Sequence, residues 1–382
     1  MREGWKTTTW GDLATLEYGK SLRDYQAETG EVPVYGTNGP IGFTDKSLCH
    51  FPSVIIGRKG AYRGVHYSDK PFFVIDTAFY LKPITDRLDL KFAYYQLLTQ
   101  DINSMDSGSA IPSTSREDFY NLQLKLPPLE TQRRIAAILS ALDEKIELNR
   151  QTNRTLETIA QVLFKEWFVD FNFPGATGEM QVSELGPIPK GWNIHSLGDV
   201  CKTTSGGTPS RNNLAFYDNG TIPWIKSKEL NNSFIITTEE KITEQALQKS
   251  SAKLLPKHSV LIAMYGATVG KIGITSMDAA CNQAICALLP TIDYPYSFFY
   301  QFLNNNRDEI ISRAVGSAQQ NISQELLKKI LLVLPPANLV KQYHKIVHKL
   351  FLAIENNINE NAILSVSRDE LLPNLLNGNI DL

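Results

Sequence analysis

Apolar residues recur at alternating spacings of four and three over residues 135–167, which is the pattern of a coiled-coil seam. The seam positions are Ile135, Leu139, Leu142, Ile146, Asn149, Asn153, Leu156, Ala160, Leu163 and Trp167. A second seam follows near the end of the chain, at Tyr343, Val347, Leu350, Ile354, Asn357, Asn361, Leu364, Arg368, Leu371 and Leu375. The pattern predicts two long helices, each with asparagine at the same two positions.

The seam asparagines Asn149, Asn153, Asn357 and Asn361 can fix the register of paired helices, because amide side chains in an apolar seam satisfy one another. Both antiparallel and parallel pairing would align the polar layers. Two equal copies related by a pseudo-twofold axis favour the antiparallel arrangement. The alternative is that each helix packs on its own globular unit and leaves its asparagines in water.

Four blocks of the first half recur in the same order in the second half, roughly 200 positions later. They are Trp10–Asp12 with Leu197–Asp199, Ser53–Gly64 with Ser259–Gly270, Gly108–Ser115 with Gly316–Ser323, and Leu126–Pro128 with Leu334–Pro336. The second copy carries extra residues, mostly between Gly206 and Ser259. Order conserved over four blocks indicates an internal duplication.

Each copy begins with short, turn-rich strand candidates and ends, after a Pro-Pro pair that stops the preceding element, in a long helix. The pattern predicts an α+β protein with a pseudo-twofold internal repeat. Globular units with mixed strands and helices are expected over residues 1–126 and 173–334. Helical regions are expected over 127–172 and 335–382, with the two helices pairing as an antiparallel coiled coil.

The composition of the chain excludes several classes of function. Lys and Arg (38) nearly balance Asp and Glu (40), so a polybasic tail is excluded, although a local basic face is not. No apolar run approaches the ~20 residues that span a bilayer. The four cysteines form no C-x-x-C pair, which argues against a zinc knuckle or a disulfide framework. With no secretory pattern in the polar segment Met1–Trp5, a cytoplasmic location is expected.

Motifs for catalysis are missing from the sequence. It contains neither a G-x-x-x-x-G-K-[ST] loop nor a G-x-G-x-x-G fingerprint, and its proline pairs lack the Asn/Asp-Pro-Pro-Tyr/Phe arrangement of amino-methyltransferases. His344 and His348 are four residues apart on a predicted helix, a spacing that can bind metal. No acidic residue of an H-E-x-x-H motif lies between them, so a packed or solvated pair is favoured. We expect no catalytic residue, cofactor or metal in this chain.

Two windows without acidic residues surround the repeated block and carry Lys46, Arg58, Lys59 and Arg63, or Lys249, Lys253, Lys257 and Lys271. Matched basic patches favour duplex DNA as the ligand, because phosphates supply much of the affinity; ordinary solvated faces are the alternative. Nearby polar residues are suited to read base edges. The candidate DNA-binding residues of the first copy are Tyr35, Thr37, Asn38, Arg58, Lys59, Arg63, Ser109, Ser113, Thr114 and Arg116. Those of the second copy are Trp224, Lys226, Ser227, Lys228, Tyr265, Lys271, Gln319, Gln320 and Asn321. The alternative assigns them to turns and caps, as we expect for Ser115 and Ser323.

Two such units, each ending in Leu-Pro-Pro and a long helix, resemble the specificity subunit of a type I restriction–modification system. The blocks Trp10–Leu13, Tyr35–Gly39, Ile56–Gly60, Gly108–Ser115 and Leu163–Phe171 carry the resemblance, which covers essentially the whole chain. It implies two target-recognition domains, each reading one half of a split, asymmetric double-stranded DNA site. It also implies helical regions that space these domains and dock two methyltransferase subunits.

The resemblance further implies that the methyltransferase subunits use S-adenosylmethionine to methylate adenine, and that a restriction subunit using ATP and Mg joins for cleavage. The chain itself would be non-catalytic. It departs from the pattern where Met264-Tyr265 replaces the Arg58-Lys59 pair, so Lys271 is expected to supply the charge there. One alternative is a specificity fragment of a fused methyltransferase–specificity enzyme, which would require a further domain with a cofactor loop. Another is a coiled-coil scaffold that binds only protein, which the matched basic windows disfavour.

Overall fold

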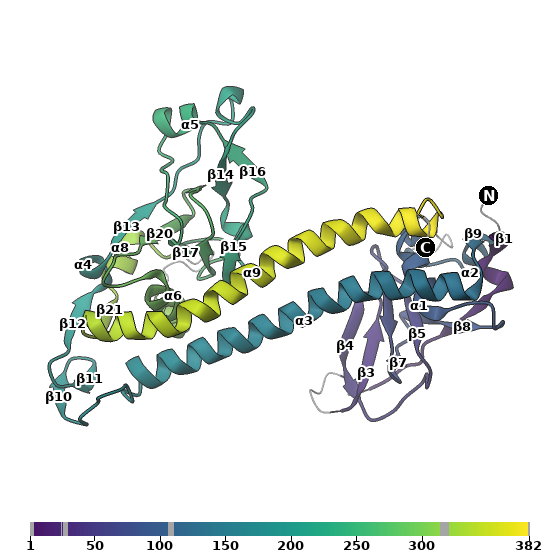
Figure 1. Ribbon diagram of the computed structural model, residues 1–382, viewed down its shortest axis with the longest axis horizontal. Helices are drawn as coiled ribbons and strands as arrows, with labels where there is room; N and C mark the ends of the chain where they lie inside the picture. The colour runs from purple at the N-terminus through teal and green to yellow at the C-terminus, as the bar shows by residue number, and fades with distance from the viewer. Residues whose placement is uncertain (1–3, 24, 26–29, 106–110, 314–320, 381–382) are drawn as a thin grey trace. The chain divides into compact units, whose positions relative to one another are not determined.

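The computed structural model describes residues 4–23, 25, 30–105, 111–313 and 321–380 (Figure 1). The chain divides into a first unit, residues 1–146 with 363–382, and a second unit, residues 147–362. Two helices of 40 residues each, α3 (Leu129–Phe168) and α9 (Ala337–Leu376), contribute to both units. None of the described helices is both long enough and apolar enough to cross a membrane.

The first unit combines three small sheets with short helices. Its strands are β1 (Lys6–Thr9), β2 (Ala14–Tyr18), β3 (Val32–Gly36), β4 (Gly39–Thr44), β5 (Ser53–Gly57), β6 (Val65–Ser68), β7 (Phe73–Val74), β8 (Ala78–Pro83) and β9 (Gln123–Leu126). Besides the ends of α3 and α9, its helices are η1 (Trp10–Asp12), α1 (Leu90–Leu98), η2 (Ile102–Ser104) and α2 (Arg116–Asn121). The sheets have the strand orders β2-β8-β5-β6, β4-β3-β7 and β1-β9.

The second unit is built the same way, with additional elements. Its strands are β10 (Met180–Ser183), β11 (Gly186–Pro189), β12 (Asn193–Ser196), β13 (Lys202–Ser205), β14 (Ile222–Ile225), β15 (Ser233–Ile235), β16 (Glu240–Ile242), β17 (Val260–Ala263), β18 (Ile272–Thr275), β19 (Ala280–Cys281), β20 (Ile285–Leu289) and β21 (Leu331–Leu334). Its shorter helices are α4 (Leu197–Val200), η3 (Leu214–Phe216), η4 (Ser227–Glu229), α5 (Glu244–Lys249), α6 (Tyr296–Asn305), α7 (Arg307–Ser312) and α8 (Gln324–Lys328).

The two units share one topology. The order β2-β8-β5-β6 recurs as β13-β20-β17-β18, with β15 added at the edge, and β4-β3-β7 recurs as β16-β14-β19. Register repeats as well: the parallel pair β3–β7 places Tyr35 opposite Val74, and β14–β19 places Ile225 opposite Cys281. The duplication predicted from the repeated blocks is therefore present in the fold of both units.

Each unit packs its core against the long helices. In the first unit, Trp10, Phe92 and Phe119 share a buried cluster with Ile135 of α3 and Leu375 of α9. In the second unit, a larger aromatic cluster surrounds Phe168, whose ring lies 5.4 Å from that of Phe298 and 5.1 Å from that of Tyr343. Burial of such side chains stabilises each unit by roughly 1.5–3 kcal/mol per large apolar residue.

The predicted seam positions of α3 and α9 are all buried or half-buried. Within the second unit, Asn149 Nδ2 donates to Asn361 Oδ1 at 2.9 Å, and Asn357 Nδ2 donates to Asn153 Oδ1 at 2.8 Å. As the residue number rises along α3, the residue number of the hydrogen-bond partner on α9 therefore falls. Within the first unit, the seam residue Arg368 forms an ion pair with Asp143 at 2.8 Å.

Equivalent glycines end the first strand of the larger sheet in each unit. A Cβ at Gly19 would lie 1.9 Å from the carbonyl oxygen of Ile75, and a Cβ at Gly206 would lie 2.2 Å from that of Asn282. Both obstacles are backbone atoms, which cannot rotate away. Only glycine fits at these positions without moving the neighbouring strand connection.

We predict that Gly19→Ala destabilises the protein by about 3 kcal/mol, because its methyl group requires a backbone shift. Gly36→Ala is the matched control, since its Cβ would meet the movable side chain of Ile41 at 3.3 Å. Thermal unfolding followed by circular dichroism should show a drop of several degrees for the first variant and little change for the second. Equal melting temperatures for both variants would contradict this account.

Candidate nucleic-acid interface

Four loops of the first unit meet and form what we call the first loop cluster, residues 36–39, 57–64, 75–78 and 112–116. The hydroxyl oxygen of Thr37 lies 2.9 Å from the carbonyl oxygens of both Lys59 and Thr77. The amide of Thr114 donates to the carbonyl of Arg58 at 2.9 Å. The amides of Arg58 and Gly60 donate to the carbonyls of Thr77 and Pro112 at 2.8 Å and 2.9 Å, so backbone groups and the Thr37 hydroxyl together hold the loops.

The second unit has an equivalent second loop cluster, residues 226–229, 263–271, 282–285 and 321–324. Ile322 donates its amide to the carbonyl of Met264 at 2.7 Å, as Thr114 does to Arg58 in the first cluster. Tyr265 forms an isolated antiparallel bridge with Asn321, which matches the bridge between Lys59 and Ser113. One repeated backbone frame thus brings together the described candidates Lys59 and Ser113 in the first cluster, and Tyr265 and Asn321 in the second.

Exposure divides the candidates of the first cluster. Asn38 is exposed, and the half-buried candidates are Tyr35, Thr37, Arg58, Lys59, Ser113 and Arg116. Thr114 is buried and donates its hydroxyl to the carbonyl of Gly57 at 2.8 Å. Ser109 lies outside the described residues.

Arg63 is held inside the first unit and does not present its charge to a ligand. Its side chain is 2% exposed, and Nη2 donates to the carbonyl of Asn103 at 2.7 Å. Nε and Nη1 have no hydrogen-bond partner among the described residues. The basic window of the sequence therefore does not form a patch in which every cation is at the surface.

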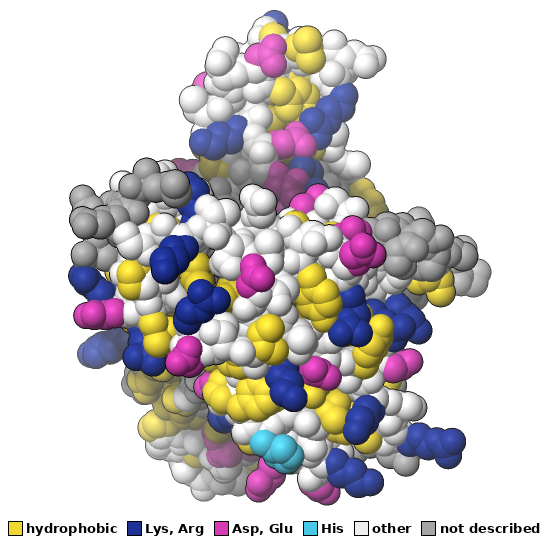
Figure 2. Space-filling model, turned by 90° about the vertical axis from the view of Figure 1, so that its right-hand side faces the viewer, with side chains coloured by type: hydrophobic (Ala, Val, Ile, Leu, Met, Phe, Trp, Pro, Cys, Tyr) yellow, Lys and Arg dark blue, Asp and Glu magenta, His cyan; other side chains and the backbone are white. Residues whose placement is uncertain are grey.

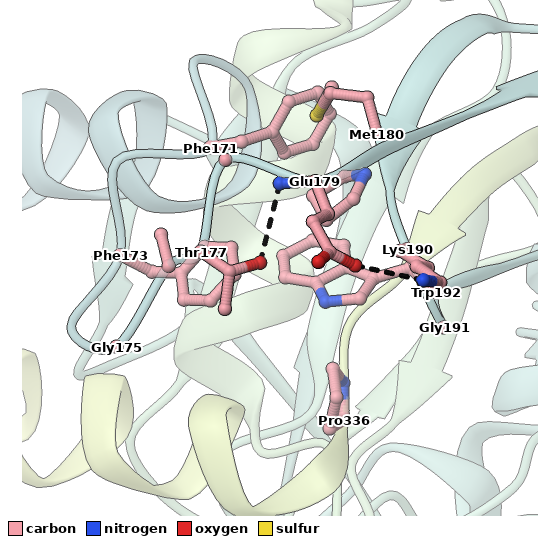
Figure 3. A pocket seen from close by; sticks show the side chains of 13 residues that line it. Phe171, Phe173, Gly175, Thr177, Glu179, Met180, Lys190, Gly191, Trp192 and Pro336 are labelled. Carbon is pink, nitrogen blue, oxygen red and sulfur yellow. Dashed lines mark hydrogen bonds and ion pairs between the residues drawn. The ribbon is translucent and has the colours of Figure 1, made fainter.

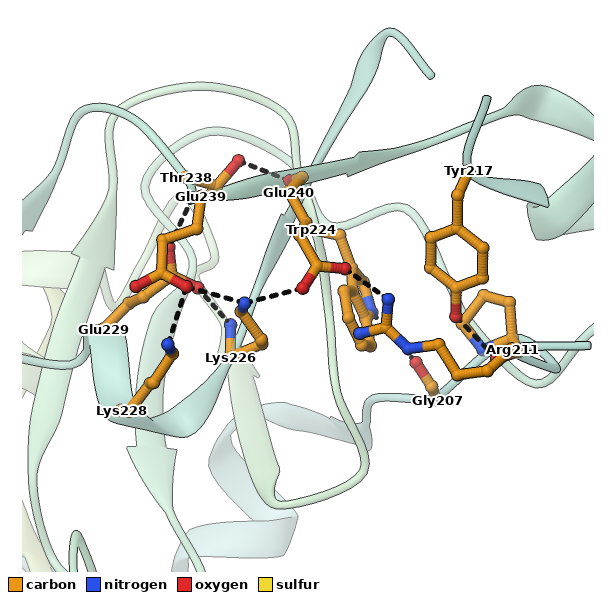
Figure 4. Close-up of polar contacts among 11 residues, drawn as sticks. Gly207, Arg211, Tyr217, Trp224, Lys226, Lys228, Glu229, Thr238, Glu239 and Glu240 are labelled. Carbon is orange, nitrogen blue, oxygen red and sulfur yellow. Dashed lines mark hydrogen bonds and ion pairs between the residues drawn. The ribbon is translucent and has the colours of Figure 1, made fainter. Parts of the chain in front are cut away.

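In the second cluster, two of the three predicted lysines, Lys226 and Lys228, are already paired with glutamates (Figure 4). Lys226 Nζ lies 2.7 Å from Glu239 and 2.8 Å from Glu240, and Lys228 Nζ lies 2.7 Å from Glu239. The indole of Trp224 is 2% exposed and donates to the carbonyl of Gly207 at 3.0 Å, so it supports the loop from inside. The ion pairs of Lys226 lie at the end of the strand pair β14–β16, where Trp224 is opposite Glu240.

Glu240 is also bound by Arg211, whose Nη1 lies 2.6 Å away and whose guanidinium stacks 4.5 Å from the centre of the Tyr217 ring. Hydrogen bonds from Arg211 and Lys226 lower the pKa of Glu240 to about 2. Besides the paired but exposed Lys228, the candidates at the surface of the second cluster are the exposed Asn321 and the half-buried Ser227, Tyr265 and Lys271. Gln319 and Gln320 lie outside the described residues.

The two helical histidines are a packed pair, as the sequence favours. His344 Nδ1 lies 2.8 Å from the hydroxyl of Ser297, and His348 Nδ1 lies 3.0 Å from that of Tyr296. Burial, together with neighbouring histidines, lowers the pKa of His344 to about 4. No group of three or more His, Cys, Asp or Glu residues in the described part of the chain could hold a metal ion.

Two predicted caps are confirmed. Ser115 accepts the amide of Asp118 at 3.2 Å, and Ser323 accepts that of Leu326 at 3.0 Å. Both therefore begin short helices, α2 and α8, beside the loop clusters.

A pocket of about 320 Å³ lies where the chain leaves α3 (Figure 3). The rings of Phe173 and Trp192 stack 5.1 Å apart at its wall. Its charged lining residues are Glu179 and Lys190, which pair with each other at 2.9 Å. These lining residues offer aromatic packing rather than an acid, base and nucleophile in one place.

Sequence reasoning missed Tyr18, which lies beside two of the candidates. The guanidinium carbon of Arg58 is 4.8 Å from the centre of its ring, and that of Arg116 is 5.2 Å away. The available signal was the dipeptide Tyr18-Gly19 at the end of a strand, which corresponds to Ser205-Gly206 in the second copy.

These observations define a class of protein: two units of one topology, differently filled loop clusters, and two long helices. The model of the type I restriction modification DNA specificity domain family matches residues 2–158 and 189–363. The chain therefore belongs to the family of type I restriction–modification DNA specificity proteins.

Related proteins and a solved structure agree with this family. The chain is 28% identical over 381 residues to the type I restriction enzyme HindI specificity subunit of Haemophilus influenzae, covering 82% of each. It is 27% identical over 299 residues to the MjaIX specificity subunit of Methanocaldococcus jannaschii, covering 76% of this chain and 69% of that one. The crystal structure of the type I S subunit from M. genitalium has the same fold, with a TM-score of 0.71, 21% identity, and coverage of 99% of this chain and 96% of that chain.

We predict that the stabilisation by Glu240 depends on pH. Because its pKa is lowered from 4.5 to about 2, its contribution is complete above about pH 4.5 and is lost as the pH falls towards 2. Glu240→Gln should therefore cost about 1 kcal/mol at neutral pH, given the partial exposure of these ion pairs, and progressively less below pH 4.5.

Melting temperatures of both proteins between pH 3 and pH 7 test this expectation. Glu325→Gln is the control, because its ion pair with Lys328 is largely exposed and should contribute little. A difference between wild type and Glu240→Gln that stays constant over this pH range would contradict the assignment.

Proposed function

We propose that the two globular units, residues 1–126 and 173–334, are target-recognition domains that each bind one half of a bipartite, asymmetric DNA site. The observation that carries the proposal is one backbone frame with different side chains at equivalent places. Arg58 in the first cluster corresponds to Met264 in the second, and both carbonyls accept the equivalent loop amide. Two domains that share a backbone arrangement but present different side chains are suited to bind two different base sequences.

The proposed DNA contacts are the candidates at the surface of the two clusters. In the first they are Tyr35, Thr37, Asn38, Arg58, Lys59, Ser113 and Arg116, and in the second Ser227, Tyr265, Lys271 and Asn321. The buried residues Arg63, Thr114 and Trp224 instead pack inside their units and form hydrogen bonds with the backbone there. To contact DNA, Lys226 and Lys228 would have to break their ion pairs with glutamate and pair with a phosphate instead.

On the face drawn in Figure 2, Lys and Arg side chains lie among acidic and hydrophobic ones, so this face has mixed charges rather than a broad positive field. Such a surface binds through placed hydrogen bonds and a limited number of phosphate contacts.

The helical regions, residues 127–172 and 335–382, are proposed to form an antiparallel coiled coil related by a pseudo-twofold axis. The hydrogen bonds Asn149–Asn361 and Asn153–Asn357 support this direction and register. The helices also expose large apolar side chains, including Leu148 and Val162 on α3 and Ile363 and Val366 on α9. We assign these exposed apolar side chains of each unit to the docking of two methyltransferase subunits.

In this assignment the chain is a non-catalytic, cytoplasmic subunit. The methyltransferase subunits would use S-adenosylmethionine to methylate adenine, and a restriction subunit would use ATP and Mg. The chain contributes sequence choice, and its partners contribute the chemistry. Methyl transfer by the purified chain, free of partner subunits, would contradict this division of roles.

We predict that the domains read their half-sites independently. Replacement of residues 1–126 by the corresponding domain of a family member with a known site should change one half of the methylated sequence and leave the other unchanged. Expression with the methyltransferase partner, followed by methylation profiling of genomic DNA, measures this. A change in both halves would show that the domains do not act separately.

We also predict that helix length sets the spacing of the half-sites. Four residues inserted into α3 after Asn153 add about 6 Å and slightly more than one turn, which a coiled coil absorbs as a stutter. The same two segments should be methylated with one or two more base pairs between them, since base pairs are stacked about 3.4 Å apart. The same insertion in the loop 175–178, outside the helix, is the control and should leave the spacing unchanged. Original spacing in both variants would contradict the prediction.

A further inference from the structure

The ring of Tyr18, at the end of β2, contacts the guanidinium groups of two arginines of the first loop cluster. Its side chain is 47% exposed, so the arrangement is accessible from solvent. The guanidinium carbons of Arg58 and Arg116 lie 4.8 Å and 5.2 Å from the ring centre, within the range of cation–π contacts. One aromatic ring therefore positions two permanent positive charges.

Protein contacts hold both guanidinium groups without neutralising them. Arg58 Nη1 donates to the carbonyl of Asp76 at 2.9 Å. Arg116 Nη2 and Nε donate to the hydroxyl of Tyr120 at 2.8 Å and 3.2 Å. Among the described residues, neither arginine has a carboxylate partner in an ion pair. Two neighbouring cations held in this way favour a bound anion.

The equivalent place in the second unit is neutral. Ser205 precedes Gly206 as Tyr18 precedes Gly19, and Gln324 follows the cap Ser323 as Arg116 follows Ser115. There the hydroxyl of Ser205 donates to Oε1 of Gln324 at 2.7 Å.

Gln324 completes this neutral network by donating from Nε2 to the hydroxyl of Thr203 at 2.9 Å. The third equivalent position is Met264, which stands where the first cluster has Arg58. The two units therefore differ by two positive charges at one place of a shared frame.

We propose that Tyr18, Arg58 and Arg116 form an anion site that binds the phosphate backbone of the DNA at the first half-site, and that the second unit has no counterpart at the equivalent place. The inference rests on the proposed function, which supplies DNA as the anion. Arg116 already uses its Nε–Nη2 edge on Tyr120, and Arg58 uses Nη1 on a carbonyl. Each guanidinium group keeps further N–H donors for a ligand. A phosphate carries the negative charge that two neighbouring cations attract, whereas a guanine edge is neutral, so the paired charges favour phosphate over a base.

The test compares Arg58→Met and Arg116→Gln, which introduce the residues of the second unit, in the complex with the methyltransferase subunits. Binding to duplexes that contain the methylated site is measured between 50 and 300 mM salt. Each variant should weaken binding roughly tenfold and reduce the slope of log Kd against log salt by about one. The methylated sequence should remain the same.

Two matched variants control for charge and position. Lys82→Met removes an exposed charge from β8 of the same unit, and Gln324→Ala alters the equivalent place of the second unit. Neither should change the salt slope. Equal slopes for the arginine variants and Lys82→Met, or a lowered slope for Gln324→Ala, would overturn the proposal.

Neutral methylphosphonate substitution provides a measurement that does not depend on the folding of a variant. Replacing single phosphates in the duplex should weaken binding of the wild-type complex at one or two positions beside the first half-site. Loss of specificity for one base pair in Arg58→Met or Arg116→Gln would instead identify a base contact and overturn the phosphate assignment. If the wild-type complex bound no specific sequence, the proposed function itself would be wrong. If it bound its site normally but no single phosphate substitution weakened binding, only the anion site proposed here would be wrong.

Discussion

The antiparallel strand pairs β1–β9 and β12–β21 are the contacts on which both units depend. In the first unit, β1 is the first strand and pairs with the last strand, β9, with Lys6 opposite Leu126. In the second unit, β12 follows the hairpin β10–β11 and pairs with the last strand, β21, with Asn193 opposite Leu334. A Pro-Pro pair follows each last strand and stops it, and the long helix begins at Leu129 or Ala337. The start and the end of each globular unit are therefore tied together at the origin of its long helix. Loss of this pairing would release the loop clusters from the helices that carry them.

Within that constraint, each loop cluster is held mainly by backbone hydrogen bonds. The amide of Thr114 bonds the carbonyl of Arg58, and the amide of Ile322 bonds that of Met264, whatever side chain each carbonyl residue carries. A frame of this kind tolerates exchange of its surface residues, since their side chains contribute little to the loop geometry. Among the described residues, the half-buried Arg58 and Arg116 of the first cluster accordingly have no acidic partner in an ion pair, whereas Lys226 in the second is balanced by two glutamates. We infer that one fold can present two unlike surfaces because main chain and side chains have separate tasks.

The duplication and the helical seam could be predicted from sequence, because similar blocks in a repeated order and heptad spacing are visible without knowledge of long-range contacts. Placement of the candidate side chains could not. Arg63 lies in a basic window, but its burial depends on Asn103, forty residues away. The pairing of Lys226 with Glu239 and Glu240 depends on the register of β14 against β16. Tyr18 contacts two arginines that lie far from it in the sequence, and no local sequence pattern predicts that these three side chains come together.

The central claim is that one chain holds two separate DNA readers. Methylation profiling of DNA modified by the wild-type chain together with its methyltransferase subunits tests it most directly. We predict a methylated sequence made of two short defined segments that differ from each other and are separated by unspecified base pairs. A single continuous motif, or two identical segments arranged as a palindrome, would contradict the account.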